Sequence, residues 1–123
     1  MLSKYFKLIA WSLVIAYLCF APADDFKKVN ITIPHFDKVV HFGMFLILAL
    51  LIAAKDNPNQ IKYPKYLLLF FAVLYGGLIE LAQYYITNTR SADWFDWGAD
   101  IVGIIAGVGL FGLLPTWMHR LLA

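Results

Sequence analysis

Four long apolar segments, separated by short charged connections, constrain this chain more than any other feature of its sequence. A transmembrane helix needs about 20 predominantly apolar residues, within a range of about 17 to 25. The segments cover approximately residues 5–21, 37–54, 66–86 and 96–117. We therefore predict an all-α fold, with residues 1–123 forming a single domain in which four transmembrane helices make a small bundle.

The composition agrees with a membrane protein. Hydrophobic residues make up 62% of the chain and charged residues 15%, whereas a soluble domain is about 45–50% apolar. The formal net charge of +2 is too small to indicate a nucleic-acid partner. Membrane lipids are the expected partners, with an oligomer left open.

The first apolar segment has two interpretations. Lys4 and Lys7 precede it, and Ala21-Pro22-Ala23 follows it as a cleavage-like site, which is the pattern of a secretory signal peptide. A retained first transmembrane helix is the alternative, and we favour it because three similar segments follow.

The distribution of basic residues predicts the orientation. Four spans place both chain termini and the connection between the second and third segments on one side. That side carries six basic residues: Lys4, Lys7, Lys55, Lys62, Lys65 and Arg120. The other side carries four: Lys27, Lys28, Lys38 and Arg90. Because cytoplasmic loops are enriched in lysine and arginine, we predict a multi-pass protein of the plasma (inner) membrane with both termini cytoplasmic.

Ionisable residues lie at similar depths in three of the predicted helices. At 1.5 Å per residue, His41 is about 6 Å from the start of the second segment. Glu80 is about 9 Å from the end of the third, and Asp100 is about 6 Å into the fourth. All three therefore lie near the external surface. Since an acid at the centre of a membrane helix costs about 2.5–3.5 kcal/mol, these side chains are expected to face protein and to have partners such as Lys38 or Arg90.

Helical periodicity places the polar residues on shared faces. Asp37 and His41 are i, i+4 neighbours, and Glu80 shares a face with Gln83. One stripe of the fourth segment carries acids followed by glycines: Asp96, Asp100, Gly103 and Gly107. The two glycines form a small-xxx-small pattern that allows close helix approach. Aromatic residues flank the same level, as in a membrane-interface belt: Tyr84, Tyr85, Trp94, Phe95 and Trp97.

These residues resemble the VanZ-like family over Asp37 to Gly112. The matching elements, in chain order, are Asp37-Lys38-Val-Val-His41, Glu80-Leu-Ala-Gln83, Arg90, Asp96-Trp-Gly-Ala-Asp100, Gly103 and Gly107. One position departs from the family pattern, because Asp100 stands where the family usually has asparagine. The resemblance implies a small four-helix membrane protein with a role in the cell envelope. The family's namesake is associated with teicoplanin resistance, and the resemblance names no reaction.

We predict a ligand-binding site whose members are Asp37, Lys38, His41, Glu80, Gln83, Arg90, Asp96 and Asp100. The favoured function is recognition of a lipid-linked or phosphate-bearing headgroup, such as an envelope precursor. Lys38 and Arg90 would contact phosphate, because arginine offers a bidentate fork and lysine a point charge.

Two alternatives remain open. In the first, the polar residues only lock the helices together, through pairs such as Asp96–Lys38 and Glu80–Arg90. In the second, the protein is a membrane-embedded hydrolase or transferase in which His41 acts as a base with Glu80 or Asp100. No cofactor is predicted, because the sequence has no metal signature such as His-Glu-x-x-His. A divalent ion held by His41, Glu80, Asp96 and Asp100 is a minor variant of the enzyme hypothesis.

Overall fold

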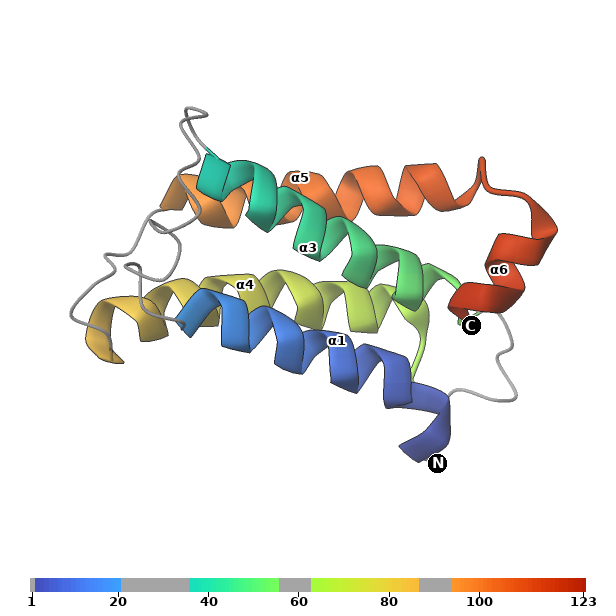
Figure 1. Cartoon of the computed structure of the whole chain (residues 1–123), viewed down its shortest axis with the longest axis horizontal. Coiled ribbons are helices and arrows are strands. Elements are labelled where there is room, and N and C mark those ends of the chain that lie inside the picture. Colours follow the sequence, from blue (N-terminus) through green and yellow to red (C-terminus); the bar gives the residue numbers. More distant parts are fainter. Residues whose placement is uncertain (1, 21–35, 56–62, 87–93) are drawn as a thin grey trace.

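The computed structural model describes residues 2–20, 36–55, 63–86 and 94–123. Within these residues the chain forms helices and no strands, so the predicted all-α fold class is confirmed (Figure 1). The helices are α1 (Leu2–Phe20), α3 (Phe36–Ala53), α4 (Lys65–Ile86), α5 (Trp94–Phe111) and α6 (Thr116–Leu122).

Four of the helices lie alongside one another in alternating directions. The two ends of the chain lie at one end of the bundle, where α6 turns away from α5 (Figure 1). The starts of α3 and α5 and the end of α4 lie together at the opposite end (Figure 1). The side chains that the sequence placed at matching depths therefore belong to the same end of the bundle.

The closest approach is between α3 and α5, and glycine makes it possible. A Cβ atom added at Gly107 would lie 2.5 Å from the carbonyl oxygen of Leu46, and one added at Gly103 would overlap the carbonyl oxygen of Phe42. No side chain fits between the two backbones at these positions. The small-xxx-small pattern therefore lies at a helix–helix contact.

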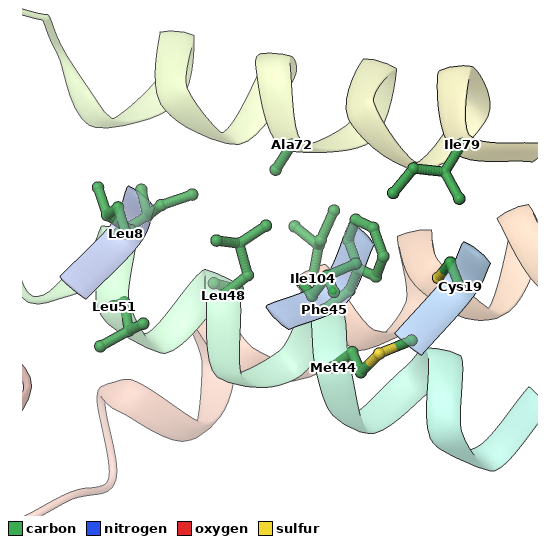
Figure 2. Close-up of a cluster of buried hydrophobic side chains, with 12 residues drawn as sticks. Leu8, Cys19, Met44, Phe45, Leu48, Leu51, Ala72, Ile79 and Ile104 are labelled. Atoms are coloured by element: carbon green, nitrogen blue, oxygen red, sulfur yellow. The ribbon is translucent and has the colours of Figure 1, made fainter. Parts of the chain in front are cut away.

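The apolar core extends along the bundle between these helices. Cys19 from α1 is buried with Phe45 from α3, and with Ile79 and Ile104 from α4 and α5 (Figure 2). Ile15 of α1 belongs to the same core. Side chains of α1 and α4 also donate hydrogen bonds to the backbone of a neighbouring helix. Three such bonds connect α1 to the bundle: Trp11 Nε1 to Met44 O at 2.8 Å, Tyr75 Oη to Ser12 O at 2.5 Å, and Gln83 Nε2 to Cys19 O at 2.6 Å.

The fourth predicted helix is shorter than expected. The sequence predicted one helix over 96–117, whereas α5 ends at Phe111 and α6 begins at Thr116. Pro115 explains the break, because proline has no N–H to donate and disfavours helical backbone in the residue before it. His119 on α6 stacks on the ring of Phe111 and donates from Nε2 to the Phe111 carbonyl oxygen at 2.9 Å.

Two helices, α4 and α5, are long and apolar enough to cross a membrane. The described part of α3 from Lys38 to Ala53 is apolar but shorter. By length and composition, the structure thus shows two candidate spans in the part of the chain that it describes.

Candidate functional site

Five polar side chains from three helices meet at the end of the bundle where α3 and α5 begin. We call Lys38, His41, Glu80, Asp96 and Asp100 the polar cluster. Glu80 and Asp100 are fully buried, at 0% exposure, and His41 and Asp96 are also buried. Buried charged groups are costly unless they are paired or hydrogen-bonded, so their convergence here requires mutual contacts.

His41 lies at the centre of the cluster and is surrounded by three carboxylates. Its Nδ1 is 2.9 Å from Asp100 Oδ1, which is a hydrogen bond in which the imidazole donates to the carboxylate. The same Nδ1 is 3.9 Å from Glu80 Oε1, and Nε2 is 3.8 Å from Asp96 Oδ2. One imidazole thus links acids from α4 and α5 to α3.

Lys38 and Asp96 form the outer edge of the cluster. Lys38 Nζ lies 3.3 Å from Asp96 Oδ1, so the ion pair considered from the sequence is present. The Lys38 side chain is 27% exposed and that of Asp96 is 11% exposed. The cluster therefore has an accessible edge at this pair and a buried interior at His41, Glu80 and Asp100.

Gly76 and Trp97 form the wall behind Asp100. A Cβ atom at Gly76 would lie 2.7 Å from Asp100 Oδ2, and one at Gly77 would lie 3.1 Å from the Trp97 ring. Trp97 Nε1 donates to the carbonyl oxygen of Val73 at 2.9 Å, which fixes α5 against α4. Asp100 Oδ2 has no hydrogen-bond partner among the described residues.

Sequence reasoning placed Trp97 in an interface belt and missed this positioning role. Its aromatic neighbours are exposed in the structure, whereas Trp97 is partly buried: Tyr84, Tyr85, Trp94 and Phe95 are the exposed ones. The signal that could have identified it is the Gly76-Gly77 pair, because two adjacent glycines on a buried helix face leave room for a large ring.

Three other predicted site residues are not part of the polar cluster as the structure describes it. Gln83 Nε2 donates to the backbone carbonyl oxygen of Cys19, so Gln83 links α4 to α1. Asp37 lies in α3, but its side chain is outside the described part of the structure. Arg90 also falls outside the described residues. The roles of all three in a binding site stay predictions.

The cluster has donor atoms suited to a cation. One ligand atom from each of His41, Glu80 and Asp96 lies within 4.8 Å of the others.

A separate cavity of about 290 Å³ lies among α1, α3 and α4. It is lined by Leu8, Ser12, Leu48, Ile52, Leu68, Phe71, Ala72 and Tyr75, and by no member of the polar cluster.

Comparison with known proteins gives one result. The family model described as VanZ/LLP1 matches residues 2–115, which is nearly the whole chain. No curated protein and no solved structure matches the chain. The matched region includes the described helices α1, α3, α4 and α5, and with them the whole polar cluster. The chain therefore belongs to the VanZ/LLP1 family.

Proposed function

We propose that this VanZ-family protein crosses the membrane four times, with α1 and α3 as spans beside α4 and α5. Helix α1 has 19 residues and α3 has 18, which lies within the length range of short spans. The hydrogen bonds of α1 to α3 and α4 favour a retained helix over a removed signal peptide.

Support for this arrangement comes from the distribution of polarity in the bundle. Large apolar side chains point outward on several helices: Phe6 is 67% exposed, Leu78 is 63% exposed and Ile105 is 67% exposed. Meanwhile Glu80 and Asp100 are buried inside. In water, exposed apolar surface costs about 25 cal/mol per Å², whereas hydrocarbon removes that cost. An apolar exterior around a polar interior suits a bilayer.

We further propose that the accessible edge of the polar cluster binds the phosphate-bearing headgroup of an envelope lipid. The observation that carries this function is the Lys38–Asp96 pair, a partly exposed ammonium at the mouth of a buried polar cluster. A phosphate approaching this edge would meet Lys38 first, and Arg90 is available from its sequence position. The buried acids behind Lys38 would accept hydrogen bonds from hydroxyl or amine groups of the headgroup.

The family relationship supports a role in the cell envelope, and through it a link to glycopeptide resistance of the teicoplanin type. The predicted orientation places the polar cluster in the outer leaflet, with both termini cytoplasmic. In that leaflet the cluster would face lipid-linked precursors of the envelope.

Lipid co-purification tests the headgroup proposal. The full chain is purified from membranes, and the lipids that remain bound are identified by native mass spectrometry. Lys38→Ala and Arg90→Ala are expected to lose the phosphate-bearing lipids that the wild type retains. Lys4→Ala, at an exposed lysine near the opposite end of the bundle, is the control and should retain them. If both site variants keep the same lipids as the wild type, the headgroup proposal is wrong.

A second candidate function rests on the 2.9 Å bond between His41 and Asp100. A base that is oriented by a carboxylate is the arrangement needed for general acid–base catalysis, so a hydrolase or transferase acting on the same lipids is the alternative. Turnover of a lipid-linked phosphate by the wild type, abolished in His41→Gln, would favour it. If neither lipid retention nor turnover depends on the cluster, its role is to lock the helices together.

A further inference from the structure

The buried half of the polar cluster is suited to a smaller ligand than a headgroup. We propose that His41, Glu80 and Asp96 together bind one divalent transition-metal cation. These three residues come from three different helices, and one ligand atom from each lies within 4.8 Å of the others. All three are buried, so an ion held between them would be shielded from bulk water.

The spacing of the donor atoms is close to that of a coordination shell. Nitrogen and oxygen ligands about 2.1 Å from a metal ion lie about 3 to 3.5 Å from one another. His41 Nε2 and Asp96 Oδ2 are already 3.8 Å apart. Because donor atoms in the set can be as far as 4.8 Å apart, binding requires them to close by up to about 1.8 Å. Other ligands, including a headgroup phosphate, would complete the shell.

The donor chemistry narrows the choice of metal. One imidazole nitrogen with two carboxylate oxygens suits Mn²⁺ or Zn²⁺, whereas copper(I) and iron–sulfur centres require the sulfur ligands of cysteine or methionine. The single cysteine, Cys19 on α1, is buried in the apolar core and is not one of the three proposed donors. Mn²⁺ is the more convenient probe because it is paramagnetic.

Asp100 acts in this arrangement as a positioning residue rather than as a ligand. Because His41 Nδ1 donates to Asp100 Oδ1, the lone pair of the neutral imidazole is on Nε2, the nitrogen nearest Asp96. Metal-binding histidines typically donate their other ring nitrogen to a carboxylate or carbonyl, which fixes the ring and raises its basicity. A carboxylate at position 100 does this more strongly than an amide would.

The inference deepens the proposed function and rests on it in one respect. A cation just inside Lys38 would give a phosphate headgroup a second positive contact, and this part requires that the headgroup proposal holds. Binding of the ion itself does not require the lipid. The experiment therefore measures metal binding in dodecyl maltoside, a detergent that carries no phosphate.

The test is a titration of the full chain in dodecyl maltoside micelles, after EDTA treatment and removal of the chelator. Mn²⁺ alone is added, and free Mn²⁺ is followed by electron paramagnetic resonance. We expect one saturable site per chain in the wild type. His41→Gln and Glu80→Gln should each abolish it, and Asp100→Asn should weaken it by about 10- to 100-fold.

Controls separate metal binding from loss of the fold. His119→Gln changes the described histidine at the opposite end of the bundle and should bind Mn²⁺ as the wild type does. Mn²⁺ should also raise the melting temperature of the wild type but not that of Glu80→Gln. If Glu80→Gln does not fold, Asp100→Asn carries the test, since it preserves shape and a hydrogen-bond acceptor for His41.

The outcomes distinguish the two proposals. Absence of saturable Mn²⁺ binding at millimolar concentrations in the wild type would overturn the metal site. So would an unchanged affinity for Mn²⁺ in both single variants, Asp100→Asn and His41→Gln. A wild type that binds Mn²⁺ while Lys38→Ala and Arg90→Ala retain their lipids supports the metal site and removes the headgroup proposal. Lipid loss in those variants without metal binding does the reverse.

Discussion

His41 and Asp100 are 59 positions apart in the sequence, yet His41 Nδ1 and Asp100 Oδ1 are 2.9 Å apart in the bundle. The bond joins α3 to α5, and further along the same two helices Gly103 and Gly107 allow the backbones to touch. The polar contact and the glycine contact are therefore parts of one interface. The distance between the imidazole and the carboxylate depends on how closely the glycines let the helices approach.

Gly103→Ala is expected to destabilise the protein and to separate the polar cluster. The added methyl group would overlap the Phe42 carbonyl, so α5 must move away from α3. Overpacking of this kind costs about 1–3 kcal/mol. The free energy of unfolding in detergent, measured by titration with sodium dodecyl sulfate, provides the check.

Gly98→Ala is the matched control on the same helix, because nothing lies within 4 Å of a Cβ atom added there. It should leave stability unchanged or raise it by about 0.5–1 kcal/mol, since alanine favours helix over glycine. Equal destabilisation by both variants would show that Gly103 is not at a close contact.

The positions of the cluster residues were open to prediction, and several of their contacts were not. The rise and period of a helix fix the depth and the facing of each residue. The sequence therefore predicted that His41, Glu80 and Asp100 lie at similar depths. It could also identify Gly103 and Gly107 as small residues on the acid-bearing stripe. These inferences need only local geometry and the cost of exposing an acid to lipid.

Contacts that depend on how the helices rotate and tilt were beyond the sequence. Trp97 lies one residue from Asp96, and periodicity alone does not show that its ring packs on Gly77 and donates to Val73. By contrast, the sequence did name the Asp96–Lys38 pair, and the packing of α3 against α5 brings the two side chains to 3.3 Å. The end of α5 is different, because Pro115 is itself a signal in the sequence for a helix kink or end, and only hydropathy extends the segment to residue 117.

Gly76→Ala is expected to act through Asp100. The added Cβ atom would lie 2.7 Å from Asp100 Oδ2 and 3.2 Å from Trp97 Cδ1, so the carboxylate must move. In an Asp100→Ala background that first clash is absent, and the cost of Gly76→Ala should fall. A double-mutant cycle of unfolding free energies should give a coupling of about 0.5–3 kcal/mol. Additive effects would mean that the carboxylate does not rest against Gly76.

Trp97→Phe is expected to lower stability by about 0.5–1.5 kcal/mol. The ring is largely kept, but the donor from Nε1 to the Val73 carbonyl oxygen at 2.9 Å is lost. Trp117→Phe is the control, because Trp117 is exposed on α6 and its loss should have little effect. Chemical unfolding in detergent compares the two variants, and an equal change in both would contradict a specific role for the Trp97 bond.

The predicted orientation can be tested with single cysteines, because the chain contains only Cys19. In a Cys19→Ala background, Asp25→Cys lies between the first two apolar segments and Asn59→Cys lies between the second and third. With both termini cytoplasmic, a membrane-impermeant maleimide added to intact cells should label Asp25→Cys and not Asn59→Cys, and permeabilised cells should show labelling of both. The reverse pattern in intact cells would invert the orientation. Labelling of both positions from outside would show that the second segment, which includes α3, does not cross the membrane, and the four-span proposal would then be wrong.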